Sequence, residues 1–214
     1  RRMSADKIEK NAEQRTLGRP RRFDRDSALL AAMRVFWAQG YEGTSIQDLV
    51  AAMGVNKPSL YATFGCKEAL FQEAVQLYDR LEGRATTESL ANAKTARDAV
   101  RAMLEANAHA YSTTEGPRGC MIVLSALLGT PDNQPVRAFL AQNRLEGERA
   151  LQKRLARGVT DGDLSPSADI AQLAAFYTTV LEGLSIQARD GASPEKLKSI
   201  IEAAMQAWPA DSKP

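Results

Sequence analysis

The segment from Thr44 to Lys67 reads TSIQDLVAAMGVNKPSLYATFGCK, and its pattern predicts two short helices joined by a tight turn. Thr44 and Gln47 stand three residues apart at the start of the first helix, a spacing that fits a capping box. Gly54 is suited to end that helix, because glycine readily adopts the left-handed conformation of a C-terminal cap. Apolar residues at helical spacing give the first helix one buried face: Ile46, Leu49, Val50 and Met53.

The second helix of the segment has an apolar side and a polar side. Asn56 is a good N-cap, and Pro58 falls in the first turn, where its missing N–H matters little. Leu60 and Phe64 form the apolar side, and a helix this short is stable only when that side packs on its neighbours. Such a helix is typical of a helix-turn-helix that reads DNA, although an ordinary helical hairpin has the same build. The polar side carries Lys57, Ser59, Tyr61 and Thr63.

The sequence around this segment resembles the DNA-binding domain of TetR-type transcriptional regulators. The resemblance covers residues 18–81 and includes GYEGTS at residues 40–45 and SLYATFGCKEALF at residues 59–71. One departure is Cys66, where the family usually has Ser, Asp or Asn as the cap of the next helix. The resemblance implies a sequence-specific DNA-binding transcriptional regulator, expected to act as a homodimeric repressor.

The resemblance also implies DNA-contact roles residue by residue. Thr44 and Gln47 are expected near phosphates, and Tyr61 and Lys67 match phosphate-contacting positions. Basic residues just before the first helix are expected to reach a phosphate or the minor groove, as N-terminal arms do in other DNA-binding proteins. Lys57, Ser59 and Thr63 match the family positions that face the major groove. The basic residues of the expected arm are Arg19, Arg21 and Arg22.

The charge distribution agrees with a DNA-binding N-terminal part. The net charge of the 214 residues is only +2, which argues against a non-specific architectural DNA binder. Residues 1–67 hold 12 Lys and Arg against 7 Asp and Glu, whereas residues 68–214 hold 16 against 19. Positive charge is therefore concentrated in the part assigned to DNA.

Several other classes of protein are disfavoured. No apolar run is long enough to span a bilayer and no signal-peptide pattern is present, so we expect a cytoplasmic protein with no membrane partner. Cys66, Cys120 and the single His109 do not form a metal-ligand spacing, so no metal and no cofactor are expected. The chain has no recognisable Ser/His/Asp set and no glycine-rich phosphate loop, and we therefore do not expect an enzyme.

The rest of the chain keeps a helical pattern, so the predicted fold class is all-α. We expect a mobile N-terminal arm over residues 1–17 and a three-helix helix-turn-helix domain over residues 18–66. A helical domain for effector binding and dimerisation is expected over residues 67–210. About nine helices are predicted, with those beyond the helix-turn-helix near residues 67–81, 95–114, 120–128, 133–157, 168–189 and 193–208.

The last two predicted helices carry wide apolar stripes. The plain interpretation is that both stripes face the core of their own subunit. In the family, the corresponding helices pair with their copies in a second chain, and a two-fold dimer places two recognition helices on a palindromic operator. Gly183 in mid-helix favours the second interpretation, because glycine lets two helices approach closely. The residues expected at this interface are Leu173, Val180, Gly183, Leu184, Ile201 and Met205.

The resemblance further implies a pocket for a small-molecule effector of unknown identity in the C-terminal domain. An alternative trigger is a thiol-based response to oxidants or electrophiles through Cys120, because a helix start lowers the pKa of a thiol. Against this, free cysteine is usually a small buried hydrophobe. The residues expected to line the pocket are Met103, Asn107, Tyr111, Cys120, Met121, Phe139, Phe176 and Tyr177.

Overall fold

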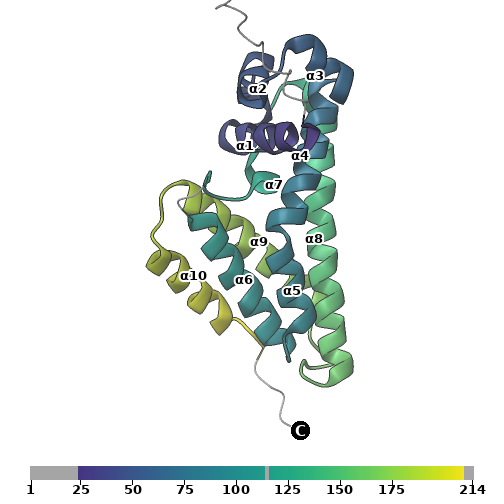
Figure 1. The fold of residues 1–214 in the computed structure, drawn as a ribbon. Helices are drawn as coiled ribbons and strands as arrows, with labels where there is room; N and C mark the ends of the chain where they lie inside the picture. The colour runs from purple at the N-terminus through teal and green to yellow at the C-terminus, as the bar shows by residue number, and fades with distance from the viewer. Residues whose placement is uncertain (1–23, 114–115, 210–214) are drawn as a thin grey trace, which may run out of the picture.

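The computed structural model describes residues 24–113 and 116–209, and every regular element in those ranges is helical (Figure 1). The predicted mobile arm over residues 1–17 and the basic residues Arg19, Arg21 and Arg22 lie outside these ranges. In chain order the helices are α1 (Arg25–Gly43), α2 (Ile46–Met53), α3 (Lys57–Phe64), α4 (Lys67–Glu82), α5 (Arg84–Asn92), α6 (Ala96–Ser112), α7 (Met121–Leu124), the 3₁₀ turn η1 (Pro131–Asn133), α8 (Gln134–Asp161), α9 (Ile170–Arg189) and α10 (Pro194–Gln206).

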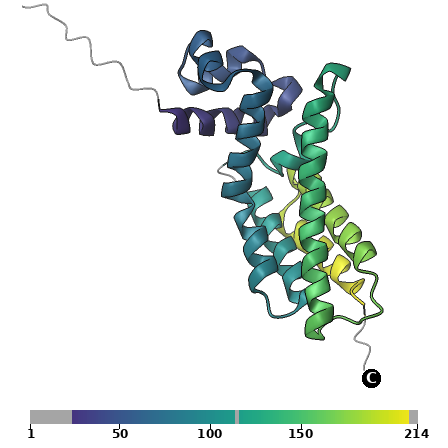
Figure 2. The same ribbon diagram turned by 90° about the vertical axis from the view of Figure 1, so that its right-hand side faces the viewer.

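Helices α1, α2 and α3 form one end of the molecule, and α4 runs from them into a longer body (Figures 1 and 2). Within the body α6 packs against α5, α9 and α10, and α8 packs against α9. The long helix α8 extends along most of the body (Figure 2). No helix in the described ranges combines the length and the apolar character that crossing a membrane would require.

Aromatic side chains join the N-terminal helices to α4. The rings of Phe36 and Tyr41 on α1 each meet the ring of Phe71 on α4 edge to face, with centroids 5.0 Å apart. Phe36 and Phe71 have no exposed surface. These contacts pack α1 firmly against the first half of α4.

The turn between α2 and α3 follows the sequence prediction. Gly54 ends α2 in the left-handed conformation, with φ of 65°. Asn56 is the N-cap of α3, where its side-chain oxygen accepts a 2.9 Å hydrogen bond from the backbone N–H of Ser59, and Pro58 lies in the first turn. Cys66 takes the N-cap position of α4, and its sulfur accepts a bond from the N–H of Ala69.

The predicted capping box at the start of α2 is displaced by one residue. Ser45, not Thr44, is the N-cap, and it exchanges hydrogen bonds with Asp48 instead of Gln47. Thr44 is 1% exposed, and its hydroxyl donates a 2.6 Å bond to the carbonyl oxygen of Gly40. The chain kinks at Gly40, and Thr44 is the C-cap of the short turn that follows, so its side chain faces back towards the Gly40 carbonyl oxygen and not towards α2.

The described residues contain ten α-helices, one more than the nine that we predicted, because α5 carries almost no apolar pattern. Leu90 is the buried residue of that helix. A second difference lies at Gly158, because the helix predicted near residues 133–157 continues as α8 to Asp161. Gly158 is needed for close packing: a Cβ there would lie 2.6 Å from the Cβ of Ala96 on α6.

The apolar stripes of α9 and α10 mostly face the core of their own chain. Tyr177 has no exposed surface, and its hydroxyl donates a 3.2 Å bond to the carbonyl oxygen of Ala204 on α10. Four of the six residues predicted at the interface are buried in the core of the single chain: Leu173, Leu184, Ile201 and Met205. Their stripe is satisfied inside the subunit, while Val180 and Gly183 remain half-exposed.

Candidate DNA interface and internal cavity

Helix α3 turns its polar side to solvent, as the sequence predicts. Leu60 and Phe64 are buried beneath it, with 0% and 4% exposure. Lys57 and Tyr61 are exposed on the outer side, and the Lys57 ammonium lies 5.9 Å from the centre of the Tyr61 ring. Ser59 and Thr63 are half-buried on the same helix, and Gln47 is exposed on α2. The helix thus offers an amine and hydroxyl groups, which suit base edges and phosphate oxygens.

Thr44 and Lys67 are less exposed than we expected for residues that contact phosphates. The buried hydroxyl of Thr44 is already bonded to Gly40, so its side chain is not available to a phosphate. Lys67 is half-buried, with its ammonium 4.3 Å from the centre of the Tyr41 ring. Burial lowers the pKa of Lys67, and nearby Glu42 offsets part of that effect.

A segment around α7 connects the DNA-binding end to the body. The backbone N–H of Tyr41 donates a 2.7 Å bond to the carbonyl oxygen of Ser125. The indole N–H of Trp37 donates a 2.8 Å bond to the carbonyl oxygen of Gly119. Arg189 of α9 donates a 2.7 Å bond to the carbonyl oxygen of Trp37. The end of α1 is therefore tied by hydrogen bonds both to the α7 segment and to α9.

The body contains a cavity of about 620 Å³ between α4, α5, α6, α7, α8 and α9. Such a volume is within the range of sites for small molecules. Four of the predicted pocket residues line it, namely Met103, Asn107, Tyr111 and Cys120. Trp37 of α1 also lines it, so a molecule in the cavity would contact the N-terminal helices directly.

Four other predicted pocket residues do not line the cavity. Met121 is fully buried in the core, and Tyr177 is held against α10. Phe139 is half-buried against the core, and Phe176 is 40% exposed on the outer face of α9. The sequence pattern identified these side chains as apolar, but it did not show the direction in which each one points.

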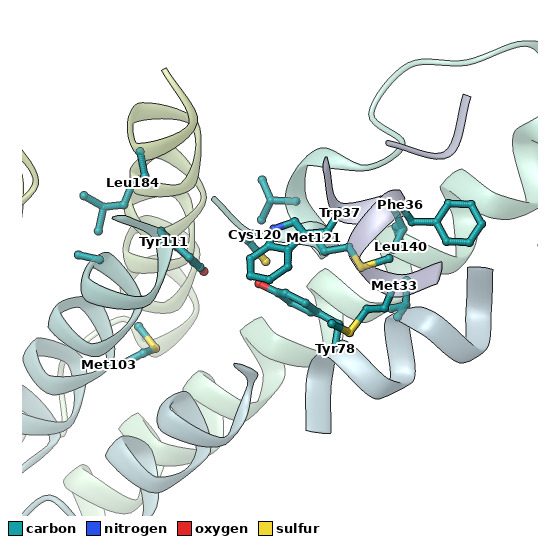
Figure 3. Packing of buried hydrophobic residues seen from close by; sticks show 14 of the residues in the cluster. Met33, Phe36, Trp37, Tyr78, Met103, Tyr111, Cys120, Met121, Leu140 and Leu184 are labelled. Carbon is teal, nitrogen blue, oxygen red and sulfur yellow. The ribbon is translucent and has the colours of Figure 1, made fainter. Parts of the chain in front are cut away.

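Cys120 lies in the cavity wall beside two tyrosines. Figure 3 shows the hydroxyl groups of Tyr78 and Tyr111 pointing towards its sulfur, with the Trp37 ring close by. Burial raises the pKa of the Cys120 thiol, and the two tyrosines and the start of α7 offset only part of that rise. The expectation of a lowered thiol pKa was therefore wrong, because Cys120 is 8% exposed.

Charged residues of α8 and α9 line the cavity and were missed by the sequence analysis. Arg144 donates a 3.0 Å bond to the carbonyl oxygen of Ile122 and lies 4.0 Å from Glu182. Burial raises the pKa of Glu182. Arg154 is 4% exposed on the same side of α8 as the buried Leu151. A charged residue on the apolar stripe of a helix was the signal that could have identified it.

Comparison with known proteins agrees with this architecture. Residues 28–74 match the family model described as bacterial regulatory proteins, tetR family. Residues 96–208 match the model described as tetracyclin repressor-like, C-terminal domain. The HTH-type transcriptional repressor ComR of Escherichia coli is 36% identical over 193 residues, which cover 90% of this chain and 92% of that protein. The repressor BdcR of the same organism is 31% identical and covers 86% of this chain and 89% of its own length.

A solved structure is also similar over nearly the whole chain. It is a cysteine mutant of the TetR family transcriptional regulator CifR, complexed with a 26-base-pair double-strand operator DNA. Its TM-score is 0.87 at 47% sequence identity, and the match covers 90% of this chain and all of that one. Two family models, full-length relatives and this structure agree, and the chain belongs to the TetR family of helix-turn-helix transcriptional regulators.

Proposed function

We propose that the protein is a homodimeric repressor that binds a palindromic operator through α3 and is released when a small molecule occupies the cavity. The observation that carries the DNA-binding part is the polar, solvent-facing side of α3 above the buried Leu60 and Phe64. The similarity to a regulator solved with operator DNA supports it.

Within this proposal the residues that contact DNA divide into two groups. Lys57, Ser59 and Thr63 contact base edges, and Tyr61, Lys67 and Gln47 contact phosphates. Thr44 is not proposed as a contact because its side chain is buried. Arg19, Arg21 and Arg22 remain candidates for an arm on the adjacent backbone or minor groove. The division of the chain into a DNA-binding part over residues 18–66 and an effector and dimer part over residues 67–210 belongs to the same proposal.

The dimer would form on the outer face of α9. Phe176 and Ile186 are 40% and 43% exposed there, and Leu145 of α8 is 48% exposed. Gly183 is half-exposed on the same helix, and a Cβ added to it would meet no heavy atom within 4 Å. Nothing in its own subunit explains this glycine, whereas a second helix approaching closely would. The dimer would set two recognition helices about 34–36 Å apart, or a multiple of that distance.

The effector would act through the contacts of α1 with the body. A ligand shifts an equilibrium only if it binds one state better than the other, so it must favour the state released from DNA. Trp37 lines the cavity and is bonded to Gly119, and Tyr41 is bonded to Ser125. A ligand that pushes Trp37 would therefore alter the placement of the whole helix-turn-helix on the body.

Gel shifts test the operator part of the proposal, with DNA fragments from around the protein's own gene at stated salt concentrations. Lys67→Ala should weaken binding to all sequences alike and reduce the salt slope by about one. Changes at Ser59 or Thr63 should alter the sequence preference, with an effect of about 1–3 kcal/mol for a good base contact. Lys94→Ala is the control, because Lys94 is an exposed lysine in the turn between α5 and α6. The proposal fails if no fragment shifts specifically, or if Tyr61→Ala with Lys57→Ala leaves the affinity unchanged.

A second candidate trigger is chemical modification of Cys120. The observation in its favour is that the thiol lines the same cavity, between Tyr78 and Tyr111. An electrophile of the Michael-acceptor class would add its carbon to the sulfur, and the thiol proton would pass to the adjacent carbon of the acceptor. The raised pKa of Cys120 weighs against this trigger. A Cys120→Ser variant that still releases DNA after treatment with a quinone would eliminate it.

A further inference from the structure

Arg154 is a buried cation whose charge Asp163 and Asp161 stabilise from a distance, without forming an ion pair with it. Its exposed fraction is 4%, and its Nη2 donates a 3.2 Å bond to the carbonyl oxygen of Ala93, between α5 and α6. Its Nε and Nη1 are enclosed and have no hydrogen-bond partner. No ion pair joins it to any carboxylate in the part of the chain that the structure describes.

The other arginines of the cavity wall are partnered. Arg144 binds the carbonyl oxygen of Ile122 and lies beside Glu182. Arg157 pairs with Asp161 at 3.4 Å and donates to the carbonyl oxygen of Ala91. Arg154 thus stands apart from the other guanidinium groups around the same cavity.

An enclosed guanidinium with unpaired N–H groups destabilises a fold. Each buried donor without a partner loses its hydrogen bonds to water, and a buried unpaired charge adds a larger penalty. The guanidinium presents its donors in a fixed planar fork, a geometry that matches a carboxylate. A ligand that supplies this carboxylate would satisfy the groups that the chain itself leaves unpaired.

We propose that the cavity binds an amphiphilic monocarboxylate whose carboxylate pairs with Arg154. This inference rests on the proposed function, because it takes the cavity as the effector site. Arg154 lines the cavity, and in the proposed complex its side chain would have to change rotamer to turn the enclosed nitrogens towards the carboxylate.

The rest of the cavity wall suits the apolar part of such a molecule. Leu90, Met103, Leu151 and Leu181 line it together with Trp37. Arg154 lies ten residues beyond Arg144 on α8, a rise of about 15 Å along the helix. The carboxylate would lie near the α5–α6 turn, and the chain would extend towards Trp37 and the α7 segment. A ligand in this orientation would press on the part of the wall that belongs to α1.

The acidic residues of the wall favour the same orientation. Glu148 and Glu182 lie around Arg144, and Asp79 and Glu82 come from the last turn of α4. These carboxylates would repel an anionic group placed beside them. Asp163 and Asp161 act on Arg154 but do not line the cavity, whereas Lys153 and Arg157 add positive charge to the wall near Arg154. A single negative charge is therefore best accommodated at this end.

The experiment compares decanoate with decanamide, a neutral molecule of the same chain length, on the full chain by isothermal titration calorimetry. Decanoate should bind at least about tenfold more tightly, because a hydrogen-bonded charge pair is absent with the amide. Arg154→Met, which keeps an unbranched side chain without charge, should remove this preference. Arg149→Gln is the matched control, since Arg149 is exposed on α8 and does not line the cavity.

Thermal unfolding provides a second readout, because a ligand that binds only the folded protein raises its melting temperature. Decanoate should raise the melting temperature of the wild type and of Arg149→Gln, but not that of Arg154→Met. Equal affinities of the wild type for the acid and the amide would overturn the proposal, as would no binding of either compound. Both of those outcomes are measured on the wild type, so they test the proposal even if Arg154→Met fails to fold.

Gel shifts with the same compounds separate this inference from the proposed function. Decanoate that binds through Arg154 but leaves the operator complex intact would support the carboxylate site and contradict the effector role. Specific operator binding by a protein that binds neither compound would support the repressor and overturn the carboxylate site.

Discussion

The backbone N–H of Tyr41 donates a 2.7 Å hydrogen bond to the carbonyl oxygen of Ser125, across the boundary between the DNA-binding helices and the body. The bond forms because α1 is broken at Gly40, where φ is 74° and ψ is 174°. That break frees the N–H of Tyr41 from the helix and directs it at the turn after α7. Glu42 adds a second link, because its carboxylate accepts a 3.0 Å bond from the N–H of Thr130.

Substitution of Gly40 by alanine should destabilise the protein by about 1–3 kcal/mol, because its backbone conformation is restricted almost entirely to glycine. The added Cβ would also lie 3.0 Å from the carbonyl oxygen of Ser125. Urea unfolding measures the loss. Gly43→Ala is the control, since a Cβ there meets only the Cβ of Gln39, at 3.7 Å. Equal stabilities of the two variants would contradict this account of the break in α1.

Ser45 and Gln47, at the start of α2, have different expected roles: Ser45 in stability and Gln47 in DNA contact. Ser45→Ala should lower the free energy of unfolding by about 1 kcal/mol, because the N–H of Asp48 loses its partner. Gln47→Ala should leave stability unchanged, since Gln47 is exposed and is not the capping partner. If Gln47 contacts a phosphate, its variant will instead weaken the gel shift at low salt. A loss of stability in Gln47→Ala matching that of Ser45→Ala would argue for the box that the sequence suggested.

Gly183→Leu should prevent dimerisation without unfolding the subunit. The added side chain meets no heavy atom of its own chain at Cβ, and leucine favours the helix more than glycine does. Light scattering after size exclusion should give a monomer, while circular dichroism remains that of the wild type. Gly147→Leu, a similar change at an open position of α8, should remain a dimer. A dimeric Gly183→Leu protein would exclude the outer face of α9 as the interface.

The two cysteines should react with iodoacetamide at different rates. Cys66 is exposed, whereas Cys120 is buried and its thiol pKa is raised. Near neutral pH the reactive thiolate of Cys120 is scarce, so mass spectrometry should find Cys66 modified first. The rate at Cys120 should increase as the pH rises towards its raised pKa, and urea should bring the two rates together. Fast modification of Cys120 near pH 7 would contradict the assigned protonation state.

The raised pKa of Cys120, together with those of two tyrosines, makes the folding stability depend on pH. The pKa values of Cys120, Tyr78 and Tyr111 are all raised in the folded protein, chiefly by burial. The folded state therefore retains protons that the unfolded chain has lost, and stability decreases as the pH rises above the ordinary pKa values of these groups. Urea unfolding between about pH 8 and about pH 10.5 should show this decrease, and Tyr78→Phe should make it shallower.

The sequence allowed the helix-turn-helix to be predicted in detail because its signals are local. Gly54, Asn56 and Pro58 each act within one helical turn, and the structure has all three in the predicted roles. The capping box was misplaced by one residue because Thr44 and Ser45 are chemically equivalent as caps. Only the path of α1 decides which of the two is drawn into the core.

The cavity was predicted only in part, because its lining depends on the direction of side chains from six helices. Met103, Asn107, Tyr111 and Cys120 line it, but Tyr177 and Met121 have the same apolar pattern and point into the core. The sequence could not show that Arg154 is enclosed, since its burial depends on α5 and on the turn at Ala93. The helix α5 itself was not predicted, because it is stabilised by packing on α6 rather than by a pattern of its own.

The amino-acid sequence by itself determined the fold class, the family and the polar side of α3, because helix caps, turn glycines and apolar spacing act over a few residues. Tertiary structure alone decided which half of each apolar stripe is core and which is surface. It also decided that Thr44 is buried, that burial raises the pKa of the Cys120 thiol, and that two nitrogens of Arg154 are enclosed without a hydrogen-bond partner. Each of these depends on burial by segments distant in the chain, which is a property of the packed molecule.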